Sequence, residues 1–129
     1  MSGKWFTPED VVAIVMGERN VVLEYYGSDW TRYDFYFRLQ NAMEFDARAI
    51  GEALRRKAKQ LDPGASPTNR PMSALDAEMA LEQDLDLGRH PKEVAANLMD
   101  LADAIERHYD TIAKAFEEKA SQCAAKIGI

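Results

Sequence analysis

The segment Asp29–Gln40, DWTRYDFYFRLQ, decides the fold class of this chain. It holds five aromatic residues within eight positions, which suits a β-strand as well as a helix. A strand pattern of alternating residues ends at Leu39, whereas a helical pattern continues well beyond it. The helical positions are spaced by three and four and recur every eleven residues: Tyr36, Leu39, Met43, Ala47, Ile50, Leu54, Ala58 and Leu61. We therefore expect one helix over residues 29–60.

A second long helix is predicted over residues 91–127. Pro91 suits the first turn of a helix, and the apolar positions after it again recur every eleven residues. They are Val94, Leu98, Leu101, Ile105, Tyr109, Ile112, Phe116, Ala120, Cys123 and Ile127. Such a repeat keeps an apolar stripe nearly straight along its helix. At a rise of about 1.5 Å per residue, the two helices would be about 48 Å and about 55 Å long. Two matching stripes predict an all-α, elongated bundle in which these two helices pack antiparallel.

The N-terminal part is harder to interpret. Thr7 and Pro8 form a typical helix start, which favours a helix over residues 8–25, broken near Gly17. The valines of 11–26 and the GERN turn within it also fit a β-hairpin, which remains the alternative.

Three prolines and a glycine mark residues 62–74 as an exposed linker. A short acidic helix, capped by Ser73, is expected to follow it. With 129 residues and an ordinary globular composition, we expect a single helical domain over 1–129.

The charge distribution limits the classes of partner. The net charge is −6, and residues 61–129 carry thirteen acidic against seven basic side chains. Direct binding of duplex nucleic acid is therefore not expected, because phosphates attract basic surfaces. The chain has neither an apolar run of the roughly 18 residues that span a membrane nor the layout of a signal peptide at its start. These features predict a cytoplasmic protein without a membrane partner.

Residue types that carry chemistry are scarce. The sequence has no glycine-rich phosphate loop and no GxSxG motif, and its two histidines, His90 and His108, lack a second ligand at metal-binding spacing. The single cysteine, Cys123, excludes an internal disulfide and fits a small buried apolar residue. We therefore expect no catalytic residue, no cofactor and no metal.

One enzymatic alternative depends on carboxylates. A small Mg²⁺-dependent, all-α nucleotide hydrolase would use inward-facing carboxylates on neighbouring helices, here Asp100, Asp103, Glu106 and Asp110 together with Glu78 and Glu82. The first four lie opposite the apolar stripe of 91–127, which predicts that they face solvent. Asp46 lies near the buried side of 29–60, where it would pair with His108 or an arginine.

A surplus of aromatic residues suggests a binding surface. Trp30, Tyr33 and Phe37 share a face of 29–60 away from the apolar stripe, and Phe45 also lies off it. Either the N-terminal helix covers them or they bind a partner, a protein being favoured over stacked bases.

The main hypothesis is a non-enzymatic helical interaction protein, such as an adaptor, inhibitor, small subunit or assembly component. Its partner would be another protein or a second copy of the chain. A variant of this hypothesis is an acidic mimic of DNA, which would add Asp100 and Asp103 to the surface. The expected partner-binding residues are Trp30, Tyr33, Phe37, Phe45, Asp76, Glu78, Glu82, Asp84 and Asp86.

Overall fold

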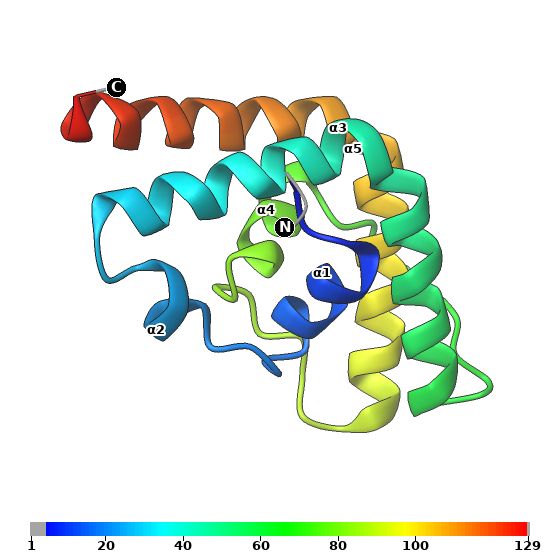
Figure 1. Cartoon of the computed structure of the whole chain (residues 1–129). Helices are drawn as coiled ribbons and strands as arrows, with labels where there is room; N and C mark the ends of the chain where they lie inside the picture. Colours follow the sequence, from blue (N-terminus) through cyan, green and yellow to red (C-terminus); the bar gives the residue numbers. More distant parts are fainter. Residues whose placement is uncertain (1–4, 129) are drawn as a thin grey trace.

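The structure, a computed structural model, describes residues 5–128 and is built from α helices (Figure 1). No strand occurs within residues 5–128, so the hairpin alternative for 11–26 is wrong and the all-α prediction is confirmed. The helices are α1 (Pro8–Val15), α2 (Val21–Tyr25), α3 (Asp29–Leu61), α4 (Ala74–Leu81) and α5 (Pro91–Ile127).

The two long helices, α3 and α5, pack side by side and form the main body of the molecule, as the matching stripes predict. The ring of Tyr36 on α3 stacks on Phe116 of α5, with 6.1 Å between the ring centroids. Most residues of both stripes are buried, among them Leu39, Met43, Ile50, Leu54, Leu98, Leu101, Ile105 and Ile112.

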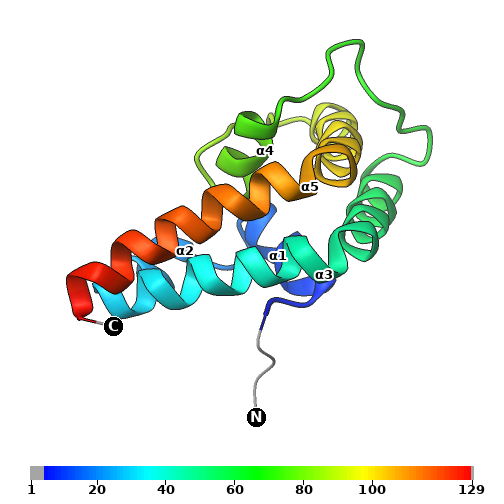
Figure 2. The same cartoon turned by 90° about the horizontal axis from the view of Figure 1, so that it is seen from above.

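Both long helices bend, which the sequence pattern does not predict. The backbone leaves helical geometry at Asp46 of α3 (φ −129°, ψ 16°) and at His108 of α5 (φ −119°, ψ 20°). Figures 1 and 2 show the two helices turning the same corner together, with α1 and α4 on the inner side of the bend. We call this corner the elbow. The core around which the two helices bend includes α1, which packs on α3, and α4, which packs on α5.

The N-terminal segment forms two short helices. Thr7 caps α1 in a capping box with Asp10, and α1 ends before Gly17, whose φ of +72° is easily adopted only by glycine. Asn20 then caps α2. The predicted break near Gly17 is therefore confirmed.

The linker 62–74 is mostly exposed, as predicted, but one of its residues is fastened to α5. The backbone N–H of Thr68 donates to the carboxylate of Asp100 (3.1 Å). Ser73 caps α4, which is buried through Ala77, Ala80 and Leu81. None of the helices in the described part of the chain is long and apolar enough to cross a membrane.

Candidate functional site

An exposed row of aromatic side chains runs along the first half of α3. We call Trp30, Tyr33, Phe37 and Phe45 the aromatic strip. Trp30 is 59% exposed and Phe45 is 65% exposed, while Tyr33 is half-buried. Within the strip, Tyr33 stacks on Phe37 (5.9 Å between centroids) and meets Trp30 edge-on (6.5 Å). The strip is therefore ordered by its own ring contacts while its outer surface stays open.

The N-terminal helices do not cover the strip, because they pack against a different face of α3. Phe35, which lies about 160° around the helix from Phe37, is fully buried. It contacts Phe6 (5.9 Å), Tyr25 (5.1 Å) and Tyr26 (5.7 Å between centroids). Within residues 5–128, the N-terminal helices therefore cover Phe35, whereas Trp30 and Phe37 remain exposed.

At its far end the strip reaches a cavity of about 490 Å³ at the elbow. Phe45 forms part of its wall and also packs against Trp5, whose indole N–H donates to Asp46. Tyr109 of α5 lines the opposite side and is partly exposed, although the apolar stripe predicts it in the core. The bend at His108 explains the difference, since Tyr109 is the next residue. The cavity is lined by Glu44, Phe45, Ala47, Arg48, Glu106 and Tyr109.

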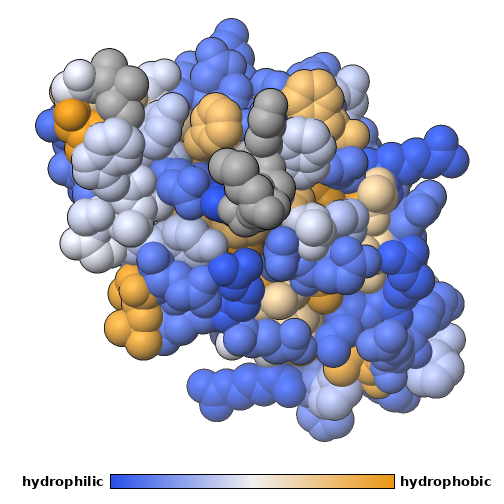
Figure 3. Space-filling view, in the orientation of Figure 1, coloured by the Kyte–Doolittle hydropathy of each residue, from blue (hydrophilic) through white to orange (hydrophobic). Residues whose placement is uncertain are grey.

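A second apolar area that the sequence did not single out lies over α2. Leu23 is 80% exposed and its neighbour Val22 is also exposed. Figure 3 shows a hydrophobic area over this helix at the lower left. The helical pattern of 8–25 does not predict it, because the break at Gly17 changes which side of the second helix faces the core.

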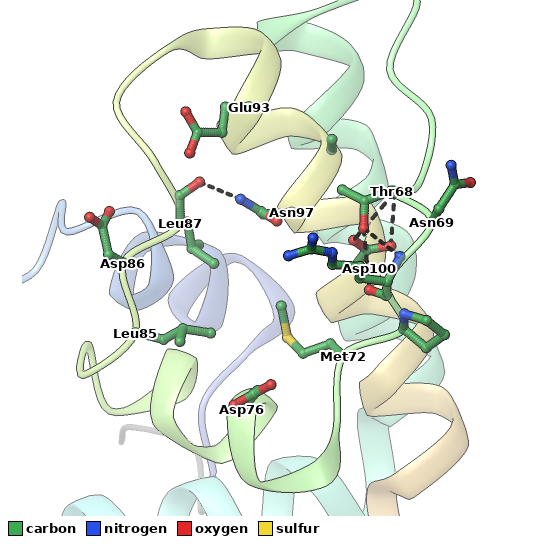
Figure 4. Close-up of a pocket in the computed structure, with 13 residues that line it drawn as sticks. Thr68, Asn69, Met72, Asp76, Leu85, Asp86, Leu87, Glu93, Asn97 and Asp100 are labelled. Carbon is green, nitrogen blue, oxygen red and sulfur yellow. Dashed lines mark hydrogen bonds between the residues drawn. The ribbon is translucent and has the colours of Figure 1, made fainter.

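A groove of about 540 Å³ separates the linker from the loop after α4, across the first turns of α5 (Figure 4). Its carboxylates include Asp76 and Asp86 from the predicted acidic surface. Several polar groups in the wall bind other parts of the chain. Asp86 accepts from the N–H of Gly88 (2.8 Å), and the amide of Asn97 donates to the carbonyl of Leu87 (2.7 Å). These bonds hold the loop in place.

Glu82 is a core residue and not part of an acidic surface, contrary to the sequence interpretation. Glu82 is only 8% exposed. The carboxylate accepts hydrogen bonds from Tyr36 (2.9 Å), Tyr26 (3.1 Å) and Lys119 (2.6 Å). Glu78 is half-buried and binds the same ammonium group at 3.3 Å. Together these residues tie α2, α3 and α4 to the outer half of α5.

Burial dominates the electrostatics of this group. Burial raises the pKa of both Tyr26 and Tyr36 above the usual tyrosine range, and the nearby charge of Glu82 adds to the shift. For Lys119, burial alone would lower the pKa, but the hydrogen bonds and charges of Glu82 and Glu78 outweigh it and the net change is upward. Folding therefore favours neutral tyrosines beside a lysine–glutamate ion pair.

The acidic row on α5, which was predicted to face solvent, does so only in part. Asp100 is only 5% exposed and accepts hydrogen bonds from the N–H and hydroxyl of Thr68. Asp103 and Glu106 both bind Arg55 of α3 at 2.6 Å. Of this row, Asp110 is exposed.

The two sets of carboxylates that the hydrolase alternative would combine thus bind two different cationic side chains. Glu78 and Glu82 bind Lys119, whereas Asp103 and Glu106 bind Arg55. Within residues 5–128, no three His, Cys, Asp or Glu side chains are grouped so as to hold a metal ion.

Asp46, Cys123 and His90 are the remaining residues that the sequence analysis considered. Asp46 accepts from Trp5, where the sequence predicted a partnership with His108 or an arginine. Cys123 is buried in the apolar stripe, as its position predicts. His90 is exposed at the start of α5 and its side chain forms no cap.

Comparison with known proteins adds no further information about the site: the sequence matches no family model, and no curated protein or solved structure matches it significantly.

Proposed function

We propose that this protein is a non-enzymatic helical interaction protein that binds another protein chain through the aromatic strip. One observation carries the proposal: the strip remains open although α1 and α2 are packed on the same helix. Large aromatic side chains are common in the centres of protein interfaces, because they bury much area with few rotatable bonds.

The strip is well suited to rigid docking. From Trp30 to Phe45 it extends about 22 Å along one helical arm, at 1.5 Å per residue. Buried Tyr36, Leu39 and Met43 fix this arm against the core on the other side. A surface that is already ordered loses little conformational entropy when a partner binds, which favours affinity.

The exposed carboxylates would influence which partners approach. Asp84 and Asp86 are exposed, and Asp76 is half-buried at the groove. An acidic surface favours encounters with basic partners and slows those with acidic ones. Glu82 and Asp100 are buried and do not contribute to such a surface, which weakens the DNA-mimic variant.

Site-specific crosslinking tests the proposal. A photo-crosslinking residue replaces Phe37 in one variant and, as a matched control, exposed Ser121 of α5 in another. Each variant is added to cell extract of the encoding organism and irradiated. The chain that becomes joined to position 37 is then identified and purified. Its affinity is then measured against the wild type and against Phe37→Ser.

We expect an adduct at position 37 and not at position 121. We also expect Phe37→Ser to weaken binding at least about tenfold without loss of helical circular dichroism. Equal adducts at both positions, or an affinity that Phe37→Ser leaves unchanged, would contradict a docking role for the strip.

A further inference from the structure

The residues around the strip identify the chemistry of its occupant. We propose that the aromatic strip binds a second copy of this chain, in an antiparallel pair of α3 helices related by a two-fold axis at Asn41. This inference rests on the proposed docking role of the strip and names its partner.

The residues on either side of Asn41 are complementary to one another across such an axis. In a two-fold antiparallel pair, the residue n positions before the axis faces the residue n positions after it in the other copy. Positions three apart then pair Arg38 with Glu44, and positions four apart pair Phe37 with Phe45. A positive charge meets a negative charge and an aromatic ring meets an aromatic ring, so the surface is complementary to itself.

A third pair follows the same rule. Positions seven apart bring Asp34 opposite Arg48, again with opposite charges. Arg48 is available for such a contact, because its side chain is 90% exposed and its ion pair with Glu52 is long, at 3.6 Å. Like charges at any of these positions would instead repel between the copies.

These residues also share one side of α3. At about 100° per residue, the five that precede the bend at Asp46 lie within about 60° of the direction of Asn41, and Arg48 follows just after the bend. Each of them is exposed or half-buried. The amide of Asn41 donates to the carbonyl of Phe37 (2.8 Å), so a polar side chain held by its own helix lies at the proposed axis. Arg38 and Glu44 both precede the bend at Asp46, so regular helical geometry applies to this pair.

The elbow supplies additional area beside the axis. One crossing of two helices is small compared with the roughly 1,200 Å² that a specific interface usually buries. The elbow cavity lies beside Phe45 and is lined on its far side by Tyr109. In the proposed pair, Phe37 of the second copy packs on Phe45 at the edge of this cavity. We therefore expect a weak, concentration-dependent dimer.

Mixing two charge-reversed variants tests this arrangement. In Glu44→Arg the homodimer would bring together arginines at 38 and 44, twice by symmetry, and in Arg38→Glu it would bring together two pairs of glutamates. Sedimentation equilibrium should show the dissociation constant of each variant raised about 30-fold, equivalent to about 2 kcal/mol. An equimolar mixture should recover the wild-type dissociation constant, because the heterodimer again pairs opposite charges at both positions.

A second mixture protects the test against a folding defect. Arg38 also binds Asp34 (2.9 Å) and lies over the ring of Phe6 (5.8 Å), so Arg38→Glu is first checked by thermal unfolding. If it is unfolded, Phe37→Lys mixed with Phe45→Glu replaces the first pair of variants, because both residues are exposed and neither takes part in that ion pair.

The outcomes separate this inference from the proposed function. A wild type that stays monomeric to about 1 mM, or variants whose mixture does not recover association, overturns the two-fold dimer. If position 37 still crosslinks to a different protein, the docking role survives that result. If neither association nor a specific crosslink is found, both proposals fail.

Discussion

Replacing Glu82 by alanine should destabilise the fold more than replacing any exposed carboxylate. The change removes the acceptor of three hydrogen bonds, from Tyr26, Tyr36 and Lys119, at a residue that is 8% exposed. A buried donor that loses its acceptor costs about 1–3 kcal/mol. Lys119 keeps the carboxylate of Glu78 (3.3 Å) and the two tyrosine hydroxyls still contact each other (3.1 Å), so we take the lower value for each donor. The total is about 3 kcal/mol.

This loss is readily measured. With about 2.1 cal/mol/K of unfolding entropy per residue over 129 residues, it lowers Tm by about 11 °C. Urea unfolding should show a lower midpoint with an unchanged slope. Asp84→Ala, at an exposed residue in the following loop, is the matched control and should change stability by less than about 0.5 kcal/mol. A loss below about 1 kcal/mol in Glu82→Ala would refute the view that this carboxylate organises the core.

Two further predictions concern titration and the linker. Because burial raises the pKa of Tyr26 and Tyr36, the unfolded chain loses these protons first, near pH 10. The stability that these two neutral tyrosines contribute is therefore fully present below about pH 10 and falls as pH rises above it. Urea unfolding midpoints measured from about pH 8 to 11 should show this decline, and the decline should be less steep in Tyr36→Phe. A flat profile would contradict the prediction. Thr68→Val removes the hydroxyl donor of buried Asp100 and should cost about 1.5–2 kcal/mol in urea unfolding, whereas Thr68→Ser keeps the donor and should cost less; equal losses would count against this bond.

Much of the helical architecture could be predicted because its signals are local. The stripes of 29–60 and 91–127 predicted both ends of α3 and of α5 to within one residue. Thr7 and Ser73 cap the helices that they were expected to start. A helix needs only its own periodicity and caps, so nearby residues carry this information.

The candidate site was only partly predictable. The face that holds Trp30 and Phe37 follows from helical spacing, but the sequence left open whether α1 would cover it. The position of the N-terminal segment depends on Phe35, because Phe6 and Tyr25 pack against its ring on a different side of the helix. The role of Glu82 had no signal of its own, because acidic residues occur on several sides of α4 and only the tertiary contacts distinguish the buried one.

The sequence by itself thus determined that the chain is helical, where the long helices begin and end, and which residues form their apolar stripes. The tertiary structure decided the bends at Asp46 and His108, the burial of Asp100 beneath Thr68, and the exposure of Tyr109. The physical reason is the range of the interactions. Helix periodicity repeats over three or four residues, whereas a bend or a buried carboxylate depends on partners far away along the chain, such as the 32 positions between Thr68 and Asp100.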